Sequence, residues 1–111
     1  MSMLNRDQKI AVMRILLDII YADGRVDVRE TSFFGELLTV LGLPSDCKDE
    51  IQKKSSLLAL MDIKNFTQDQ KKYLATLMDQ MIKVDEDINV NEVAIYDVVA
   101  DYCKIPIPFE E

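Results

Sequence analysis

The sequence predicts an all-α fold of five to seven helices, built from two duplicated helix-loop-helix halves with a pseudo-two-fold relation. Three observations lead to this prediction. Residues 5–44 repeat as residues 67–106 without a gap. Apolar residues recur at helical spacing in both copies, and no segment has the alternation of a β-strand. The 111 residues fit one domain, residues 1–111, with a single hydrophobic core.

The repeat relates positions that lie 62 residues apart, as in Asp7 and Asp69. A repeat of this length is typical of a duplicated helix-loop-helix unit and not of a solenoid. Identical residues recur in both copies and the apolar positions agree as well. The matching pairs include Gln8 and Gln70, Ile20 and Ile82, Asp23 and Asp85, Glu30 and Glu92, Ile15 and Leu77, and Phe34 and Tyr96.

The first half is expected to contain helices over residues 6–22 and 28–41. Asn5 and Gln8 have the spacing of a capping box at the start of the first helix. The apolar stripe of that helix is broad enough for a central helix of the fold. Gly42 is placed to end the second helix, because glycine readily adopts the left-handed backbone found after helix C-termini.

The segment between the halves, residues 45–66, is long enough for one or two shorter helices. Ser45 and Ser55 are the expected N-caps, because a serine hydroxyl accepts a hydrogen bond from a free N–H of the first turn.

The second half is expected to repeat the pattern with helices over residues 68–84 and 90–104. Thr67 and Gln70 form the matching capping box. The C-terminal stretch "IPIPFEE" contains two prolines and is expected to be extended.

Composition excludes several classes of function. The net charge of −7 disfavours nucleic acid and anionic membrane surfaces as partners, because both select clustered Lys and Arg. The chain has no histidine, which excludes Ser-His nucleophiles and imidazole zinc sites. Cys47 and Cys103 are expected to be buried thiols in a reducing cytoplasm. The sequence shows no signal-peptide core and no apolar run of the roughly 20 residues that span a bilayer, so we expect a cytoplasmic protein without direct membrane insertion.

Two acidic stretches occupy equivalent places in the repeat: "ADGRVDVRE" at residues 22–30 and "VDEDINVNE" at residues 84–92. Both look at first like calcium loops, but neither is an EF-hand. An EF-hand needs a bidentate Glu at the twelfth loop position. Counted from Asp23 this position is Phe34, and counted from Asp85 it is Tyr96.

Helix capping is one interpretation of these stretches. Asp27-x-x-Glu30 and Asn89-x-x-Glu92 have the spacing of capping boxes. The preceding aspartates, Asp23 and Asp85, can close Asx-turns. Capping leaves the three adjacent carboxylates at residues 85–87 unexplained, since they repel one another. A hard cation bound by oxygen ligands would relieve that repulsion, so the sequence leaves both interpretations open.

The order of a long apolar helix, "ADGRVDVRE" and a second apolar helix resembles the TerB-like tellurite-resistance domains, a family that includes the N-terminal domains of DjlA-type co-chaperones. The family motif D-G-x-[IV]-D-x-x-E is met in the first loop by Asp23, Gly24, Val26, Asp27 and Glu30. The second loop departs from it, because Glu86 replaces the glycine and Asn89 replaces the second aspartate.

This resemblance implies a cytoplasmic stress-response or interaction module with a divalent-cation site, for Ca²⁺ or Mg²⁺, at its acidic loops. Another protein is the expected partner. The ligands that the resemblance implies are Asp23, Asp27, Glu30, Asp85 and Glu92. The acidic cluster in the second loop adds Asp87 to this set.

Two other interpretations compete with the cation-binding module. In one, the protein is a purely structural interaction domain whose acidic loops only cap helices. In the other, paired carboxylates perform acid–base catalysis. The absence of histidine and of a phosphate-binding glycine loop argues against catalysis, and we expect no enzymatic activity.

Overall fold

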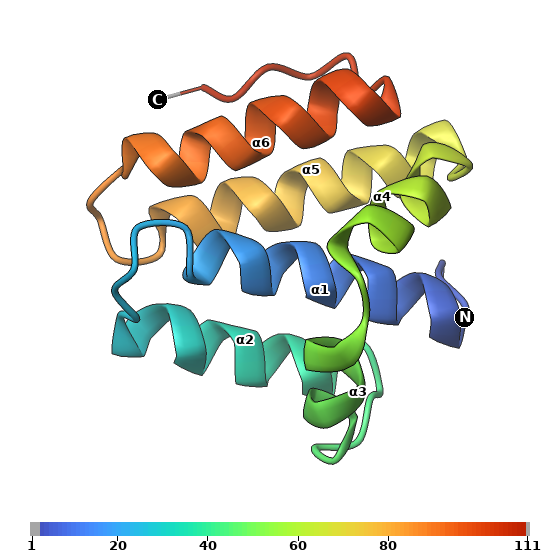
Figure 1. Ribbon diagram of the computed structural model, residues 1–111, viewed down its shortest axis with the longest axis horizontal. Coiled ribbons are helices and arrows are strands. Elements are labelled where there is room, and N and C mark those ends of the chain that lie inside the picture. The colour runs from blue at the N-terminus through green and yellow to red at the C-terminus, as the bar shows by residue number, and fades with distance from the viewer. Residues whose placement is uncertain (1–2, 111) are drawn as a thin grey trace.

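The computed structural model describes residues 3–110, which form six helices and contain no strand (Figure 1). The helices are α1 (Arg6–Ile20), α2 (Val28–Val40), α3 (Cys47–Lys53), α4 (Ser56–Lys64), α5 (Gln68–Lys83) and α6 (Val90–Cys103). The all-α prediction and the predicted number of helices are confirmed. The pseudo-two-fold relation between the halves stays a prediction.

The four long helices begin where the sequence predicted and end one or two residues earlier. At the end of α1 the N–H of Ala22 bonds to the carbonyl of Ile19, so the helix tightens into a turn before its predicted end. The capping boxes of α1 and α5 are confirmed. Their glutamines, Gln8 and Gln70, also touch each other, with Gln70 Nε2 lying 3.3 Å from Gln8 Oε1.

The segment between the halves forms the two short helices α3 and α4. Ser55 caps α4 by accepting a hydrogen bond from the N–H of Leu58. Ser45 was wrongly predicted as the cap of α3. Asp46 precedes α3 with a helical backbone and no side-chain cap, and the N–H groups of Cys47 and Lys48 bond to the carbonyls of Pro44 and Ser45 instead.

Left-handed residues end two of the long helices. Gly42 follows α2 with φ of 72°, and the N–H of Leu43 bonds back to Leu38, as predicted for this glycine. At the end of α6 Lys104 takes the same backbone region with φ of 60°. The described part of the C-terminal tail then runs extended, and the hydroxyl of Tyr96 donates to the carbonyl of Ile107.

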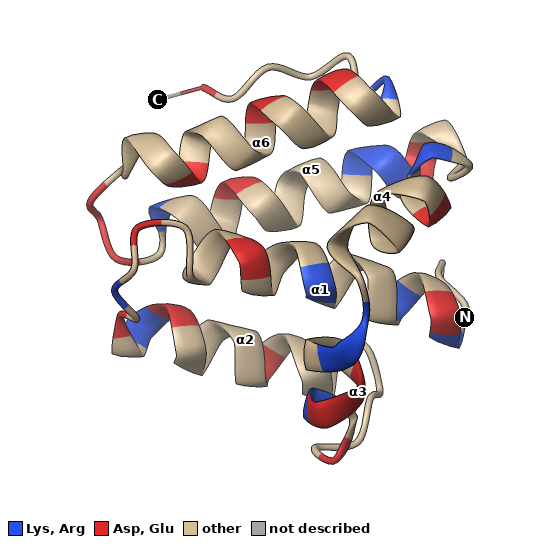
Figure 2. Cartoon of the chain, viewed as in Figure 1, with Lys and Arg blue, Asp and Glu red and all other residues tan. Residues whose placement is uncertain are grey.

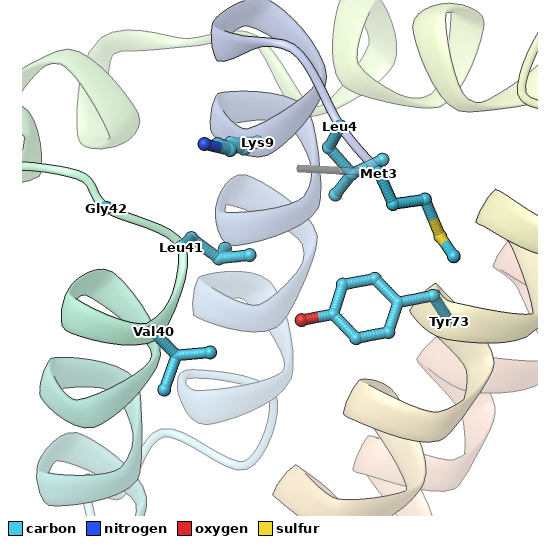
Figure 3. Close-up of a pocket in the computed structure, with 7 residues that line it drawn as sticks. All are labelled: Met3, Leu4, Lys9, Val40, Leu41, Gly42 and Tyr73. Carbon is cyan, nitrogen blue, oxygen red and sulfur yellow. The ribbon is translucent and has the colours of Figure 1, made fainter. Parts of the chain in front are cut away.

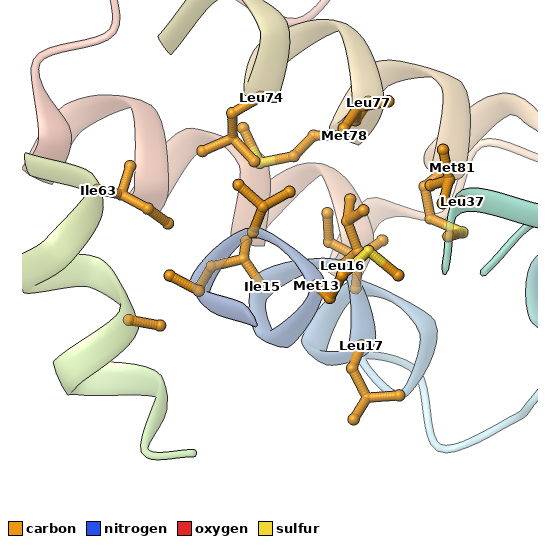
Figure 4. Packing of buried hydrophobic residues seen from close by; sticks show 14 of the residues in the cluster. Met13, Ile15, Leu16, Leu17, Leu37, Ile63, Leu74, Leu77, Met78 and Met81 are labelled. Carbon is orange, nitrogen blue, oxygen red and sulfur yellow. The ribbon is translucent and has the colours of Figure 1, made fainter. Parts of the chain in front are cut away.

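Helix α1 is the centre of the fold and packs against each of the other five helices. Apolar side chains from α1, α2, α4 and α5 interlock around it (Figure 4). Met13, Met78 and Met81 are fully buried in this core, where flexible thioether side chains fill irregular space. Each large apolar side chain buried in this way contributes roughly 1.5–3 kcal/mol.

Cys47 and Cys103 are both buried and unpaired by disulfide, as predicted. None of the helices in residues 3–110 combines the length and the apolar character that a membrane crossing requires.

Candidate functional site: the paired acidic loops

The two acidic loops lie side by side at one end of the molecule. The turn between α1 and α2 and the turn between α5 and α6 meet at the left of Figure 1, and acidic positions gather there in Figure 2. A hydrogen bond joins them directly, because Asn89 Nδ2 donates to Asp23 Oδ2 over 3.1 Å. Two segments that are 62 residues apart in sequence therefore form one surface.

Each loop opens with the predicted Asx-turn. Asp23 Oδ1 accepts from the N–H of Arg25 at 3.0 Å, and Asp85 Oδ1 accepts from the N–H of Asp87 at 3.1 Å. The residue after each aspartate is left-handed: Gly24 has φ of 78° and Glu86 has φ of 64°. The second loop thus keeps the geometry of the first without a glycine.

Asp27 and Asn89 cap α2 and α6, which confirms that part of the prediction. Asp27 Oδ1 accepts from the N–H of Arg29 at 2.7 Å, and Asn89 Oδ1 accepts from Asn91 and Glu92 at 2.8 and 3.3 Å. Hydrogen bonds from Arg29, through both its guanidinium and its backbone, hold the pKa of Asp27 below its usual value. Asp27 therefore already accepts hydrogen bonds from the first turn of α2 and from the guanidinium of Arg29.

Glu30 and Glu92 form the centre of the site. They sit one turn into α2 and α6, and among residues 3–110 they are the acidic side chains that are buried, each only 1% exposed. Their carboxyl groups hydrogen-bond to each other. The backbone N–H of Asp27 lowers the pKa of Glu30, but the complete capping box that the spacing predicted forms at neither α2 nor α6. The meeting of the two carboxyls was not predicted.

Two carboxyl groups can hydrogen-bond only when one of them carries a proton. Burial raises the pKa of Glu92 to about 9, with further increases from Glu30 and from the charges of Asp85 and Asp23. Burial also raises the pKa of Glu30, while the hydrogen bond from Glu92 opposes that shift. At neutral pH Glu92 therefore keeps its proton and can donate it in a hydrogen bond to Glu30.

The pair has acceptor capacity left over. Glu30 Oε2 and Glu92 Oε1 are buried, and no N–H or hydroxyl group of the described residues donates to them. A buried acceptor without a donor costs roughly 1–3 kcal/mol. Carboxylate oxygens in this position are the ligand type that Ca²⁺ and Mg²⁺ prefer, so the chemistry of the site fits a hard cation.

The ligand set implied by the sequence is only partly brought together. Glu30 and Glu92 meet, and the charges of Asp23 and Asp85 raise the pKa of Glu92. Asp27 is held by Arg29, and Asp87 is exposed. Across residues 3–110 no three Asp, Glu or Cys side chains converge in a geometry that could hold a metal ion. A cation at this site requires further carboxylates to turn inward.

A second hollow lies near the opposite ends of α1 and α2 and has a different character. It has a volume of about 440 Å³, and Lys9 is the charged residue in its lining. Leu41, which follows α2, and Tyr73 of α5 extend toward it (Figure 3). This pocket offers no carboxylate and cannot share the chemistry of the acidic loops.

Comparisons with known proteins define the fold but not a family. No family model matches the sequence, and no curated protein matches it. The structure is similar to that of a protein of unknown function, PG1108 from Porphyromonas gingivalis W83. The TM-score is 0.77 at 20% sequence identity, over 96% of this chain and 90% of that one. At this identity the likeness shows a shared all-α fold alone.

Proposed function

We propose that the protein is a small, non-enzymatic cytoplasmic module in which a divalent cation joins the two acidic loops. The cation would take the place of the proton shared by Glu30 and Glu92. The observation that carries this proposal is the buried pair itself, which presents oxygens without donors where the two loops meet. The motif resemblance to TerB-like domains supports the same assignment.

The proposed ligands are Glu30 and Glu92 with Asp23 and Asp85. Each aspartate would turn one oxygen inward, and backbone carbonyls and water would complete the six or more oxygens that these cations take. We leave Asp27 and Asp87 outside the set, because Asp27 is held by Arg29 and Asp87 is exposed. Bound in this way, the cation would fix the relative position of α2 and α6.

Proton release tests this proposal. Calorimetric titration with MgCl₂ or CaCl₂ in two buffers of different ionisation enthalpy counts the protons released per bound cation. We expect about one proton per cation near neutral pH, because the cation must displace the proton on Glu92. Glu92→Gln should abolish binding, since the amide mimics the protonated acid and cannot ionise.

Glu36→Gln is the matched control, because Glu36 is an exposed glutamate on α2, away from the pair. This variant should bind the cation as the unchanged protein does. Binding that survives Glu92→Gln, or binding without proton release, would place the cation elsewhere.

A purely structural role is the second candidate, and the hydrogen bonds of the loops favour it. Asp23, Asp27, Asp85 and Asn89 each accept a backbone N–H in a turn or a cap. These interactions shape both loops without a cation. Absence of any binding heat with both salts would leave this role as the function of the loops.

A further inference from the structure

An apolar groove opens on a different face, between α1, α4 and α6. Its volume is about 490 Å³, and its walls include Leu60 of α4 with Ile95 and Val98 of α6. Tyr21 also lines it and is 49% exposed, while Val98 is 60% exposed. Leu57, one helical turn before Leu60 of α4, is exposed as well and extends the apolar surface.

The polar groups on the floor of the groove are already satisfied within the chain. Arg14 binds Asp18 at 2.6 Å and the carbonyl of Gln52 at 2.9 Å, and Ser56 donates to Asp18 at 2.7 Å. The charges of Arg14 and Asp18 therefore cancel locally. An occupant need not supply polar partners for this floor and can place apolar side chains against it.

The outer rim of the groove is acidic. Asp97 and Asp101 lie three residues after Ala94 and Val98, both of which line the groove, so their side chains stand beside it on α6. Acidic positions recur along this helix in Figure 2. Both aspartates are exposed and neither takes part in an ion pair within the described residues. The rim therefore presents unneutralised negative charge.

We propose that this groove binds an amphipathic helix of a partner protein, with apolar side chains against Leu60, Ile95 and Val98 and Lys or Arg residues facing Asp97 and Asp101. The walls are helices and residues 3–110 contain no strand edge, so helix-in-groove packing is the mode that fits. A second copy of this chain fits poorly, because it would bring like charges together in a molecule of net charge −7. The proposal does not depend on the cation.

Two synthetic peptides test the proposal. Both are about 16 residues long, or about 24 Å as helices, and share one leucine spine with i, i+3, i+4 and i+7 spacing. One carries lysine at its polar positions and the other carries glutamate. Titration of ¹⁵N-labelled protein, followed by amide chemical shifts, detects even weak binding and maps it. We expect the lysine peptide to shift groove residues of α1, α4 and α6, and to bind about tenfold more tightly than the glutamate peptide.

Two substitutions of exposed valines separate the groove from the rest of the surface. Val98→Gln should weaken binding of the lysine peptide by roughly fivefold or more. Val40→Gln is the matched control, because Val40 is exposed on α2 and should leave binding unchanged. A double variant with Asp97→Asn and Asp101→Asn should bind the lysine peptide and the glutamate peptide with similar affinity.

Three results would overturn the proposal. These are equal binding of the two peptides to the unchanged protein, absence of shifts with either peptide, and shifts confined to another face. Groove shifts that depend on protein concentration without peptide would assign the groove to a second copy instead.

Discussion

At the scale of the residue, the pair formed by Glu30 and Glu92 depends on one proton, and its neutral member can be replaced by an amide. Glu92→Gln keeps a donor to Glu30 in a side chain of the same shape. Below about pH 4.5 Glu92 is protonated in the folded and the unfolded chain alike, and there we expect the free energy of unfolding of the variant to lie within about 1 kcal/mol of the unchanged protein. Glu92→Ala leaves Glu30 buried without that donor and should cost about 3 kcal/mol. Urea unfolding measures both, and equal losses would show that the hydrogen bond is not the stabilising contact.

The same pair sets a pH dependence with a definite sign. The pKa of Glu92 is raised in the folded state, from a usual value of 4.5 to about 9, so the folded protein holds a proton that the unfolded chain has lost. Stability from this group is complete below about pH 4.5 and is lost as pH rises toward 9, by up to about 1.4 kcal/mol per pH unit. The groups that face the pair are Asp23, Asp27 and Asp85.

The difference between the unchanged protein and Glu92→Gln isolates this contribution. Unfolding free energies at about pH 6 and about pH 9 should show the unchanged protein losing stability relative to the variant as pH rises. A difference that stays constant with pH would mean that Glu92 titrates normally.

The sequence located the acidic loops but not the contact between their glutamates. Capping, one of the two interpretations of Glu30 and Glu92, is a local interaction that a spacing of three residues indicates, and cation binding was implied by a motif within each loop. Their meeting depends on how α2 and α6 pack, which local spacing does not contain. The repeat held one usable signal, since Gln8 with Gln70 and Glu30 with Glu92 are equivalent pairs whose members touch in the structure.

At the scale of the element, two glycines of one half should respond oppositely to the same substitution. Gly24 has φ of 78° in the first acidic loop, where an L side chain is strained although no atom obstructs its Cβ. Gly24→Ala should cost about 1 kcal/mol. Gly35 lies inside α2 with open space around its Cβ, so Gly35→Ala should stabilise by roughly 0.5–1 kcal/mol. Thermal unfolding of both variants checks the contrast, and a stabilised Gly24→Ala would contradict it.

Helix positions were predictable because caps and apolar periodicity are local. Asn5, Thr67 and Ser55 each cap the helix that follows, and Gly42 ends α2. Ser45 failed because backbone carbonyls already satisfy the first turn of α3. The groove between α1, α4 and α6 could not be predicted from the sequence, because its walls come from three helices and no local pattern specifies how they pack.

At the scale of the whole molecule, cation binding should raise stability, because a ligand that binds only the folded state shifts the unfolding equilibrium. The gain is about 2.7 kcal/mol at a hundredfold excess over Kd. Thermal melting with EDTA, and then with millimolar Ca²⁺ or Mg²⁺ at matched ionic strength, measures it. The double variant Asp23→Asn with Asp85→Asn should lose the effect. An unchanged midpoint in the unchanged protein would leave capping as the role of the loops.

The two buried cysteines give the molecule internal reporters of its opening. Cys47 Sγ lies 3.6 Å from the guanidinium of Arg6, where α3 meets α1, and Cys103 Sγ lies 3.6 Å from the carbonyl of Leu60, where α6 meets α4. A thiol reagent reaches each sulfur only when the two helices that bury it move apart. Alkylation with iodoacetamide, followed by mass spectrometry of peptides, should label Cys47 first, because α3 has only seven residues. The ratio of the two labelling rates then shows whether the short helix detaches by itself or only when the whole chain unfolds.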